Sequence, residues 1–214
     1  MSDPIHTERR QVLRILAAAG ATASITALSP AAHAAPCADD GTPLQFVPKT
    51  QPDPDPLDNE LSKYPKCPYC GMDRRQFHYS RHLVHYQDDR VDPTCSLHCA
   101  ALSLALNLDR GPKAIYAADY GATTEPKPLM DVDKAIYLIG SKLPGVMTQQ
   151  SKVAFSARPA AEATRAEQGG ELGNFDAALR AAYLSMASDT QMIRKKRAER
   201  RQRAGQAGQA GQGQ

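Results

Sequence analysis

The alternation of apolar and polar residues predicts one folded region over 65–188. Aromatic and β-branched residues in "FHYSRHLVHY" predict a strand over 77–86, which ends at a polar turn. The next element is predicted to be a helix with Thr94 as its N-cap and Cys95 in its first turn, and it is expected to stop at Gly111. Its apolar side chains share one face, formed by Leu97, Ala101, Leu104 and Leu108.

The rest of the folded region reads as short strands followed by helices. Apolar runs between turn residues predict strands over 113–120, 135–140 and 151–157, with a capped turn at 131–134. A helix is expected over 159–170, and Asn174 is expected to cap a last helix that begins at Phe175. This order predicts an α+β fold of mixed small sheets with packed helices, compatible with two similar halves.

The first 34 residues are typical of an export signal. Arg9 and Arg10 precede a short apolar run, and Ala32-His33-Ala34 offers small residues for cleavage. The arginine pair favours the twin-arginine route, which exports folded proteins; the alternative is an ordinary secretory signal. Either reading predicts a periplasmic protein.

Two polar segments are expected to flank the folded region. Residues 35–64, with "QPDPDPLDNE", read as a disordered proline- and aspartate-rich linker. Residues 189–214 read as a basic, disordered tail, because 194–203 carry a net charge of +6 and an Ala-Gly-Gln repeat follows. The chain from 35 to 193 carries −4, so no nucleic-acid partner is expected. The tail is interpreted as a solvated helix end, with weak contact to an anionic membrane surface as the alternative.

Five cysteines carry the candidate chemistry: Cys37, Cys67, Cys70, Cys95 and Cys99. In an exported protein disulfides are the first alternative, including a bridge between the two pairs. However, the C-x2-C and C-x3-C spacings close very short loops, so a bond within either pair would stabilise the fold little.

The alternative to disulfides is a metal site. Four thiolates could supply a structural Zn(II) tetrahedron. Met72 and Met147 add thioethers, and thiolate with thioether is the ligand set that favours Cu(I). Within the expected helix, Cys95, His98 and Cys99 share a face, and a helix N-terminus would lower the pKa of the Cys95 thiol.

The motifs "CPYCGM" and "TCSLHC" are similar to the TRASH and YHS class of metal-binding cysteine modules. From Cys67 to about Asp176 the chain resembles the NosL family, exported copper chaperones for nitrous-oxide reductase maturation. The resemblance rests on "CPYCGM" followed in order by "AIYAADY", "DVDKAIYLIG", "GVMTQQSKVAFS" and "GGELGNFDAAL". It implies two ββαβ units and metal contacts from Cys70 and Met72, then Cys67. Met147 matches the methionine of the family's proline-methionine-glycine loop, although valine and threonine flank it here.

Two departures from the family accompany this resemblance. Most members lack the "TCSLHC" cysteines, and the residues before Cys37 do not fit lipoprotein processing, so an unanchored periplasmic protein is expected. The leading hypothesis is a non-enzymatic metallochaperone that delivers Cu(I) to a periplasmic copper enzyme or its assembly factors. The alternatives are a structural Zn(II) protein and a thiol-disulfide oxidoreductase using Cys67 and Cys70. No helix is expected after Cys70 to stabilise a nucleophilic thiolate, which counts against the oxidoreductase.

Overall fold

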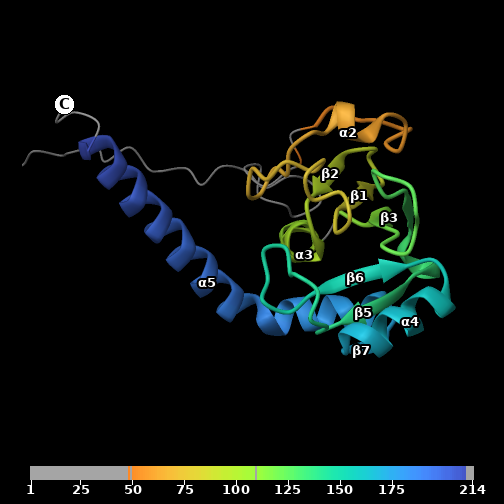
Figure 1. Cartoon of the computed structure of the whole chain (residues 1–214). Helices are drawn as coiled ribbons and strands as arrows, with labels where there is room; N and C mark the ends of the chain where they lie inside the picture. Colours follow the sequence, from red (N-terminus) through yellow and green to blue (C-terminus); the bar gives the residue numbers. More distant parts are fainter. Residues whose placement is uncertain (1–47, 49, 109, 211–214) are drawn as a thin grey trace, which may run out of the picture. The chain divides into compact units, whose positions relative to one another are not determined.

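The computed structural model describes residues 48, 50–108 and 110–210 of the 214-residue chain. Within this part, two small sheets and their helices follow one another along the chain (Figure 1). The first group of elements comprises α2 (Glu60–Lys63), β1 (His82–Tyr86), β2 (Val91–Thr94), α3 (Leu97–Leu106), β3 (Pro112–Ala118) and β4 (Leu129–Asp131). The second comprises η2 (Val132–Lys134), β5 (Ile136–Ile139), β6 (Lys152–Phe155), α4 (Arg158–Gln168), β7 (Glu171–Gly173) and α5 (Phe175–Ala210).

The two sheets repeat one topology. In the first sheet, of order β2-β1-β3-β4, β1 lies between β2 and β3. In the second sheet, of order β6-β5-β7, β5 lies between β6 and β7 in the same way. Every pairing between these strands is antiparallel, and a helix, α3 or α4, connects the second strand to the third in each half. The α+β class and the two ββαβ units are therefore confirmed.

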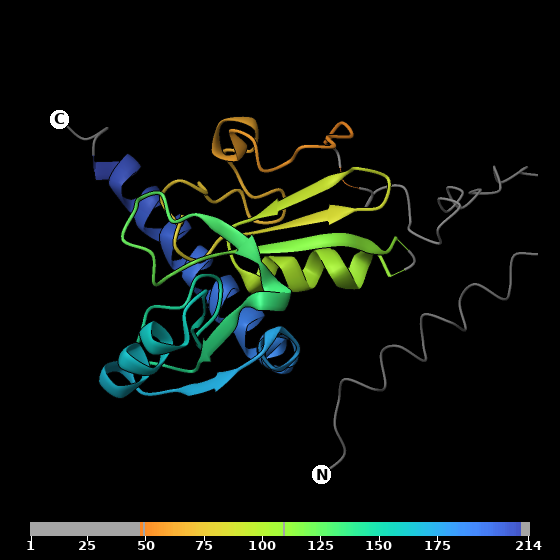
Figure 2. The ribbon, with the colours of Figure 1, turned by 90° about the vertical axis from the view of Figure 1, so that its right-hand side faces the viewer.

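Apolar side chains from both halves form one core. Val84 and Leu97 from the first half pack with Tyr137 from the second and with Ala178 and Ala182 of α5. A hydrogen bond also joins the halves, because the Tyr137 hydroxyl lies 3.0 Å from Nε2 of the buried His82. Figure 2 shows α3 lying along the first sheet.

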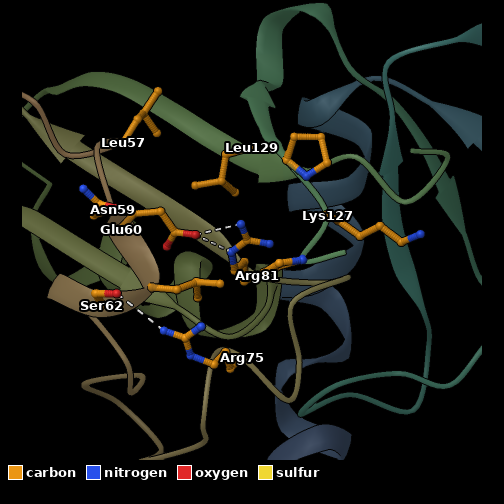
Figure 3. Close-up of a pocket in the computed structure, with 11 residues that line it drawn as sticks. Leu57, Asn59, Glu60, Ser62, Arg75, Arg81, Lys127 and Leu129 are labelled. Atoms are coloured by element: carbon orange, nitrogen blue, oxygen red, sulfur yellow. Dashed lines mark hydrogen bonds and ion pairs between the residues drawn. The ribbon is translucent and has the colours of Figure 1, made fainter. Parts of the chain in front are cut away.

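Ordered structure begins earlier in the chain than the sequence suggested, within the segment expected to be a linker. The Thr50 hydroxyl donates to the Val91 carbonyl at 2.8 Å, and α2 follows at Glu60. The buried Glu60 carboxylate pairs with Arg81 at 2.7 Å (Figure 3). It also pairs with Arg74 at 2.8 Å. These ion pairs hold α2 against the first sheet, a long-range effect that local composition could not reveal.

The last helix is also longer than the sequence suggested. The Asn174 side chain accepts from the Ala177 amide at 3.0 Å, which confirms the expected cap, but α5 then continues through the basic segment to Ala210. Alanine, glutamine and charged residues with good helix propensity make up this segment as far as Gly205. Among the described helices, none combines the length and apolar character needed to cross a bilayer.

Three boundaries in the first half were predicted wrongly. Residues 77–80 form turns, so the strand begins only at His82. Thr94 ends β2 and pairs with His82, so it is not a helix cap; Ser96 occupies the cap position of α3. Pro93, which suggested the start of a helix, lies in the edge strand β2. A proline is tolerated there because an edge strand can leave its outer backbone positions without an N–H donor. The helix ends at Leu106, before the expected Gly111.

Candidate metal centre

The first pair of cysteines lies on a tight loop between two paired residues, Lys66 and Asp73. The Cys67 amide donates to the Met72 carbonyl at 2.9 Å, and the Gly71 amide donates to the Cys67 carbonyl at 2.9 Å. Gly71 has a φ of +77°, which lets the chain turn back sharply after the second thiol. The loop therefore directs both thiols to the same side.

A buried arginine fixes this loop against the first sheet. The Arg74 guanidinium donates to the Tyr64 carbonyl at 2.7 Å and to the Thr94 carbonyl at 3.2 Å. Tyr64 lies just before the first cysteine pair and Thr94 just before the second. Arg74 thus ties the two cysteine segments together, and the Glu60 carboxylate, which it shares with Arg81, offsets part of the buried positive charge.

The second pair lies where β2 gives way to α3. Cys95 precedes the helix, Cys99 lies in its first turn, and their sulfur atoms are 3.8 Å apart. The Ser80 hydroxyl donates to the Cys95 carbonyl at 2.8 Å, which fixes the backbone at this junction. The strand-to-helix turn thus places both thiols beside the loop of the first pair.

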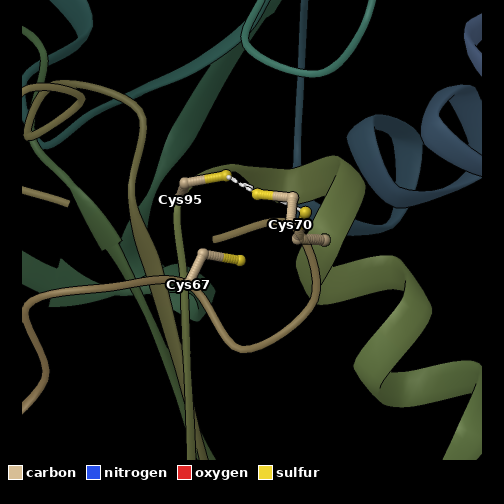
Figure 4. A group of neighbouring side chains, drawn as sticks. Cys67, Cys70 and Cys95 are labelled. Atoms are coloured by element: carbon tan, nitrogen blue, oxygen red, sulfur yellow. Dashed lines mark hydrogen bonds between the residues drawn. The ribbon is translucent and has the colours of Figure 1, made fainter. Parts of the chain in front are cut away.

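The four sulfur atoms form one cluster. All lie within 4.8 Å of one another, and those of Cys70 and Cys95 are 3.4 Å apart. Figure 4 shows Cys67, Cys70 and Cys95 directed toward a common space. A disulfide needs about 2.05 Å, so these thiols are unbonded. A metal held tetrahedrally at about 2.3 Å places its sulfur ligands about 3.8 Å apart, so the cluster has the size of a metal site.

The thiols strongly influence one another's ionisation. The pKa of Cys67 is lowered, chiefly because the Cys70 thiol hydrogen-bonds to its thiolate, with help from Cys95 and Cys99. The pKa of Cys95 and that of Cys99 are raised, first by their hydrogen bonds to Cys67 and then by those to Cys70. The expected lowering at Cys95 is therefore wrong: this residue lies outside the helix. One thiolate forms easily, and a metal would displace the remaining protons.

The cluster is closed except on one side. Cys67, Cys95 and Cys99 are at most 2% exposed, whereas Cys70 is half-buried. Met72 and Met147 pack against the cluster, as do three aromatic side chains, those of Tyr69, Phe77 and Tyr79. A metal bound here would lie in an apolar, sulfur-rich environment that meets solvent beside Cys70.

Met147 is held in an unusual backbone conformation. Its φ is +60°, in the left-handed region that an unbranched side chain adopts at the expense of some strain. The buried Asp189 of α5 accepts from the Gln149 amide at 2.9 Å and so anchors this loop. The methionine predicted as a ligand is thus positioned against the thiol cluster by a distant helix.

His98 is the predicted ligand that the structure does not bring to the cluster. Its Nδ1 atom lies 3.5 Å from the Asp189 carboxylate, and no atom of it belongs to the four-sulfur group. Burial lowers the pKa of His98, although Asp189 acts in the opposite direction. Cys95 precedes α3, so helical periodicity does not relate its position to that of His98. Cys37 lies outside the described residues.

Sequence reasoning missed the contribution of α5. Met192 lines a cavity of about 920 Å³ together with Cys70, Met72 and Met147. Treating 189–214 as a tail hid this methionine. The sequence feature that could have predicted the longer helix is the absence of glycine and proline from Phe175 to Ala204, in a segment rich in good helix formers.

The chain was compared with curated proteins, solved structures and protein families. None of the curated proteins compared with the chain matches it. The crystal structure of the copper chaperone NosL from Shewanella denitrificans has a TM-score of 0.45 and 24% sequence identity to the chain, covering 52% of this chain and 87% of that one. The model of the NosL family matches residues 58–183, more than half of the sequence, including both cysteine pairs and both ββαβ units. This chain therefore belongs to the NosL family.

Proposed function

We propose that this protein is a metallochaperone that binds Cu(I) through Cys67, Cys70, Cys95 and Cys99 and passes it to another protein. The single observation that carries the proposal is the convergence of four free thiols within 4.8 Å, in a chain of the NosL family. The reaction is ligand exchange, so no catalytic residue is required, and we regard the protein as a non-enzyme.

The surroundings of the thiols favour Cu(I) over harder ions. Thiolate and thioether are soft, polarisable donors, whereas no carboxylate or imidazole of the described residues belongs to the sulfur group. Met72 and Met147 pack against the cluster, and in this proposal their thioethers replace a thiolate during exchange. The half-buried Cys70 offers an incoming protein a reachable sulfur, and the buried thiols retain the ion meanwhile.

The proposal is tested by anaerobic titration of the reduced protein against a chromophoric Cu(I) chelator. We expect stoichiometric Cu(I) uptake that Cys70→Ser weakens strongly, and transfer of bound Cu(I) to a competing thiol protein. A folded protein that cannot withdraw Cu(I) from a weak chelator would contradict the proposal. Leu108→Ser, a change at an exposed residue remote from the thiol cluster, is the matched control.

Structural Zn(II) binding is the second candidate, because three of the four thiols are fully enclosed. A resident ion would be needed for folding, so removing Zn(II) with a chelator would then unfold the protein. Retention of the folded state in the metal-free, reduced protein would favour Cu(I) transfer instead. Circular dichroism before and after chelation distinguishes the two.

Thiol-disulfide exchange is less well supported. The Cys70 sulfur lies 3.4 Å from that of Cys95, a residue outside the C-x2-C pair. Turns rather than a helix follow Cys70, so no helix N-terminus stabilises a thiolate there. We further propose that residues 1–34 direct twin-arginine export to the periplasm and that the recipient is a copper enzyme such as nitrous-oxide reductase. Immunodetection of the mature protein in a periplasmic fraction, and its loss on replacement of Arg9 and Arg10 by lysine, would test the export route.

A further inference from the structure

The cavity of about 920 Å³ beside the thiol cluster has two walls of different character. One wall comes from the cysteine loop and the 144–148 loop and includes Cys70, Met72 and Met147. The other wall is one face of α5, beginning at Met192. Its charged residues are Lys196, Arg197, Glu199, Arg200 and Arg203.

This cavity is the route to the metal centre. Of the four thiols, only that of Cys70 lines it, and the other three are buried. A molecule that reaches Cys70 through this cavity therefore passes the α5 wall. Whatever recognises this wall also controls access to the bound metal.

The α5 wall is strongly positive and unneutralised. Four basic residues and one acidic residue line it, and no ion pair joins the basic residues of 194–203 to any other described residue. Arg197 and Arg200 are exposed. A positive wall repels a free cation, so an isolated copper ion is a poor match for this entrance. An anionic partner would lower the repulsion within the helix as it docks.

We propose that this groove docks an acidic segment of the partner protein that exchanges copper at Cys70. The inference rests on the proposed function and names the chemistry of its partner. Carboxylates of the segment pair with the arginines of α5, which is favourable because guanidinium groups bind carboxylates in a two-pronged geometry. Met192 precedes the basic residues on α5 and lines the same groove as Cys70. It therefore adds a thioether to the groove through which copper would be exchanged.

A protein segment fits the groove better than a lipid surface does. The basic residues of the wall line a cavity, whereas stable insertion of a helix into a bilayer surface needs apolar side chains beside outward-facing charges. Between 194 and 203 the helix carries no aromatic residue and one apolar side chain, that of Ala198. Such a helix has little apolar surface to insert between headgroups.

The test uses the full chain and a fluorescein-labelled octa-glutamate peptide, with octa-glutamine as the uncharged comparison. Arg197→Glu with Arg200→Glu reverses two charges of the wall; Arg194→Glu with Lys195→Glu makes the same charge change on residues outside the groove. We expect the first pair to weaken peptide binding at least about 10-fold and the second pair less than about 3-fold. Added salt should weaken binding by the unmodified chain.

The other outcomes overturn the inference. Equal losses in both double variants would indicate general attraction to a basic helix, and tighter binding to phosphatidylglycerol vesicles than to the peptide would indicate a membrane role. Self-association that the Arg197/Arg200 variant abolishes would make a second copy the occupant. Cu(I) stoichiometry, measured on each variant, separates the two proposals. Loss of peptide binding with intact Cu(I) uptake in the Arg197/Arg200 variant supports docking; failure of the unmodified chain to take up Cu(I) removes only the chaperone role.

Discussion

The two ββαβ halves differ most where the second strand meets the helix. Cys95 and Ser96 separate β2 from α3, and Ser156 and Ala157 separate β6 from α4. Counted from these junctions, Cys95 corresponds to Ser156, and Cys99 corresponds to Ala160. The same backbone turn therefore presents two thiols in one half and a hydroxyl and a methyl group in the other.

What precedes each half differs as well. The first half follows the loop with Cys67 and Cys70, which Arg74 ties to the end of β2. The second half has no cysteine, and its Ser156 hydroxyl donates to Asp119 instead. The ββαβ unit is thus repeated, whereas the four-thiol cluster is built only from the loop before the first half and from Cys95 and Cys99 at its strand-to-helix junction.

The most severe test converts the first junction into the second by Cys95→Ser with Cys99→Ala. The variant loses two of the four thiolate ligands and should therefore bind Cu(I) at least about 100-fold more weakly, which corresponds to about 2.7 kcal/mol. Competition with a chromophoric Cu(I) chelator measures the loss. The stability of the metal-free protein should change much less, because the variant places at the first junction the side chains that the second junction already has, Ser156 and Ala160.

The reciprocal variant is the control for this conversion. Ser156→Cys with Ala160→Cys places two thiols at the second junction, where no cysteine loop lies before the strand. We expect it to gain no site comparable with the native one. A second tight Cu(I) equivalent in this variant would show that the junction alone is sufficient, against the role assigned to the added loop.

The second half was predicted more accurately than the first, for a physical reason. The strands β5 and β6 and the helix α4 are bounded by local signals, such as Gly169 after α4, so their order could be predicted from the sequence. In the first half, long-range contacts decide the structure. Thr94 is a strand residue because it pairs with His82, which no local pattern encodes.

The candidate site shows the same limit. The spacing of the cysteines identified all four candidates, since C-x2-C and C-x3-C are uncommon outside redox and metal sites. Their convergence depends on Arg74 and Glu60, and the latter lies in a segment expected to be unstructured. His98 was misplaced because helix periodicity was applied from Cys95, one residue before the helix cap. Local patterns therefore identified the donors but not their geometry.

The two connecting helices should differ in their contribution to stability. The first residue of α3, Leu97, is 1% exposed in the core, and the first residue of α4, Arg158, is exposed. Leu97→Ala should lower the free energy of unfolding by about 2–5 kcal/mol and Arg158→Ala by less than about 0.5 kcal/mol. Urea denaturation of the reduced, metal-free protein measures both. Equal effects would contradict the placement of Leu97 in the core and of Arg158 at the surface.

The burial of His82 should make stability depend on pH. Burial lowers the pKa of His82 from 6.5 to about 4, so its neutral ring donates from Nδ1 to the Ser80 carbonyl and accepts from Tyr137. The unfolded chain then binds a proton that the folded chain does not. Stability should fall by up to about 3 kcal/mol as the pH drops from about 6.5 to about 4.

Urea titrations across this pH range test the prediction on the metal-free protein. His82→Gln should remove this part of the pH dependence, because glutamine has no titrating group. Tyr137→Phe should retain it, because burial rather than the hydrogen bond is the main cause of the lowered pKa. An unchanged slope in His82→Gln would assign the dependence to other groups.

The smallest expected effect comes from replacing either of two matched glycines. One lies in the cysteine loop and the other follows α4. Gly71 and Gly169 have φ angles of +77° and +69°, and no other atom lies within 4 Å of where a Cβ would stand. Alanine should therefore destabilise through backbone strain alone, by about 1–2 kcal/mol at Gly71 and at least as much at Gly169. Only Gly71→Ala should also weaken Cu(I) binding, because the turn at Gly71 directs Cys70 to the cluster. An equal loss of Cu(I) affinity in Gly169→Ala would mean that affinity follows global stability, and the separation between the repeated ββαβ unit and the cysteine loop would then fail.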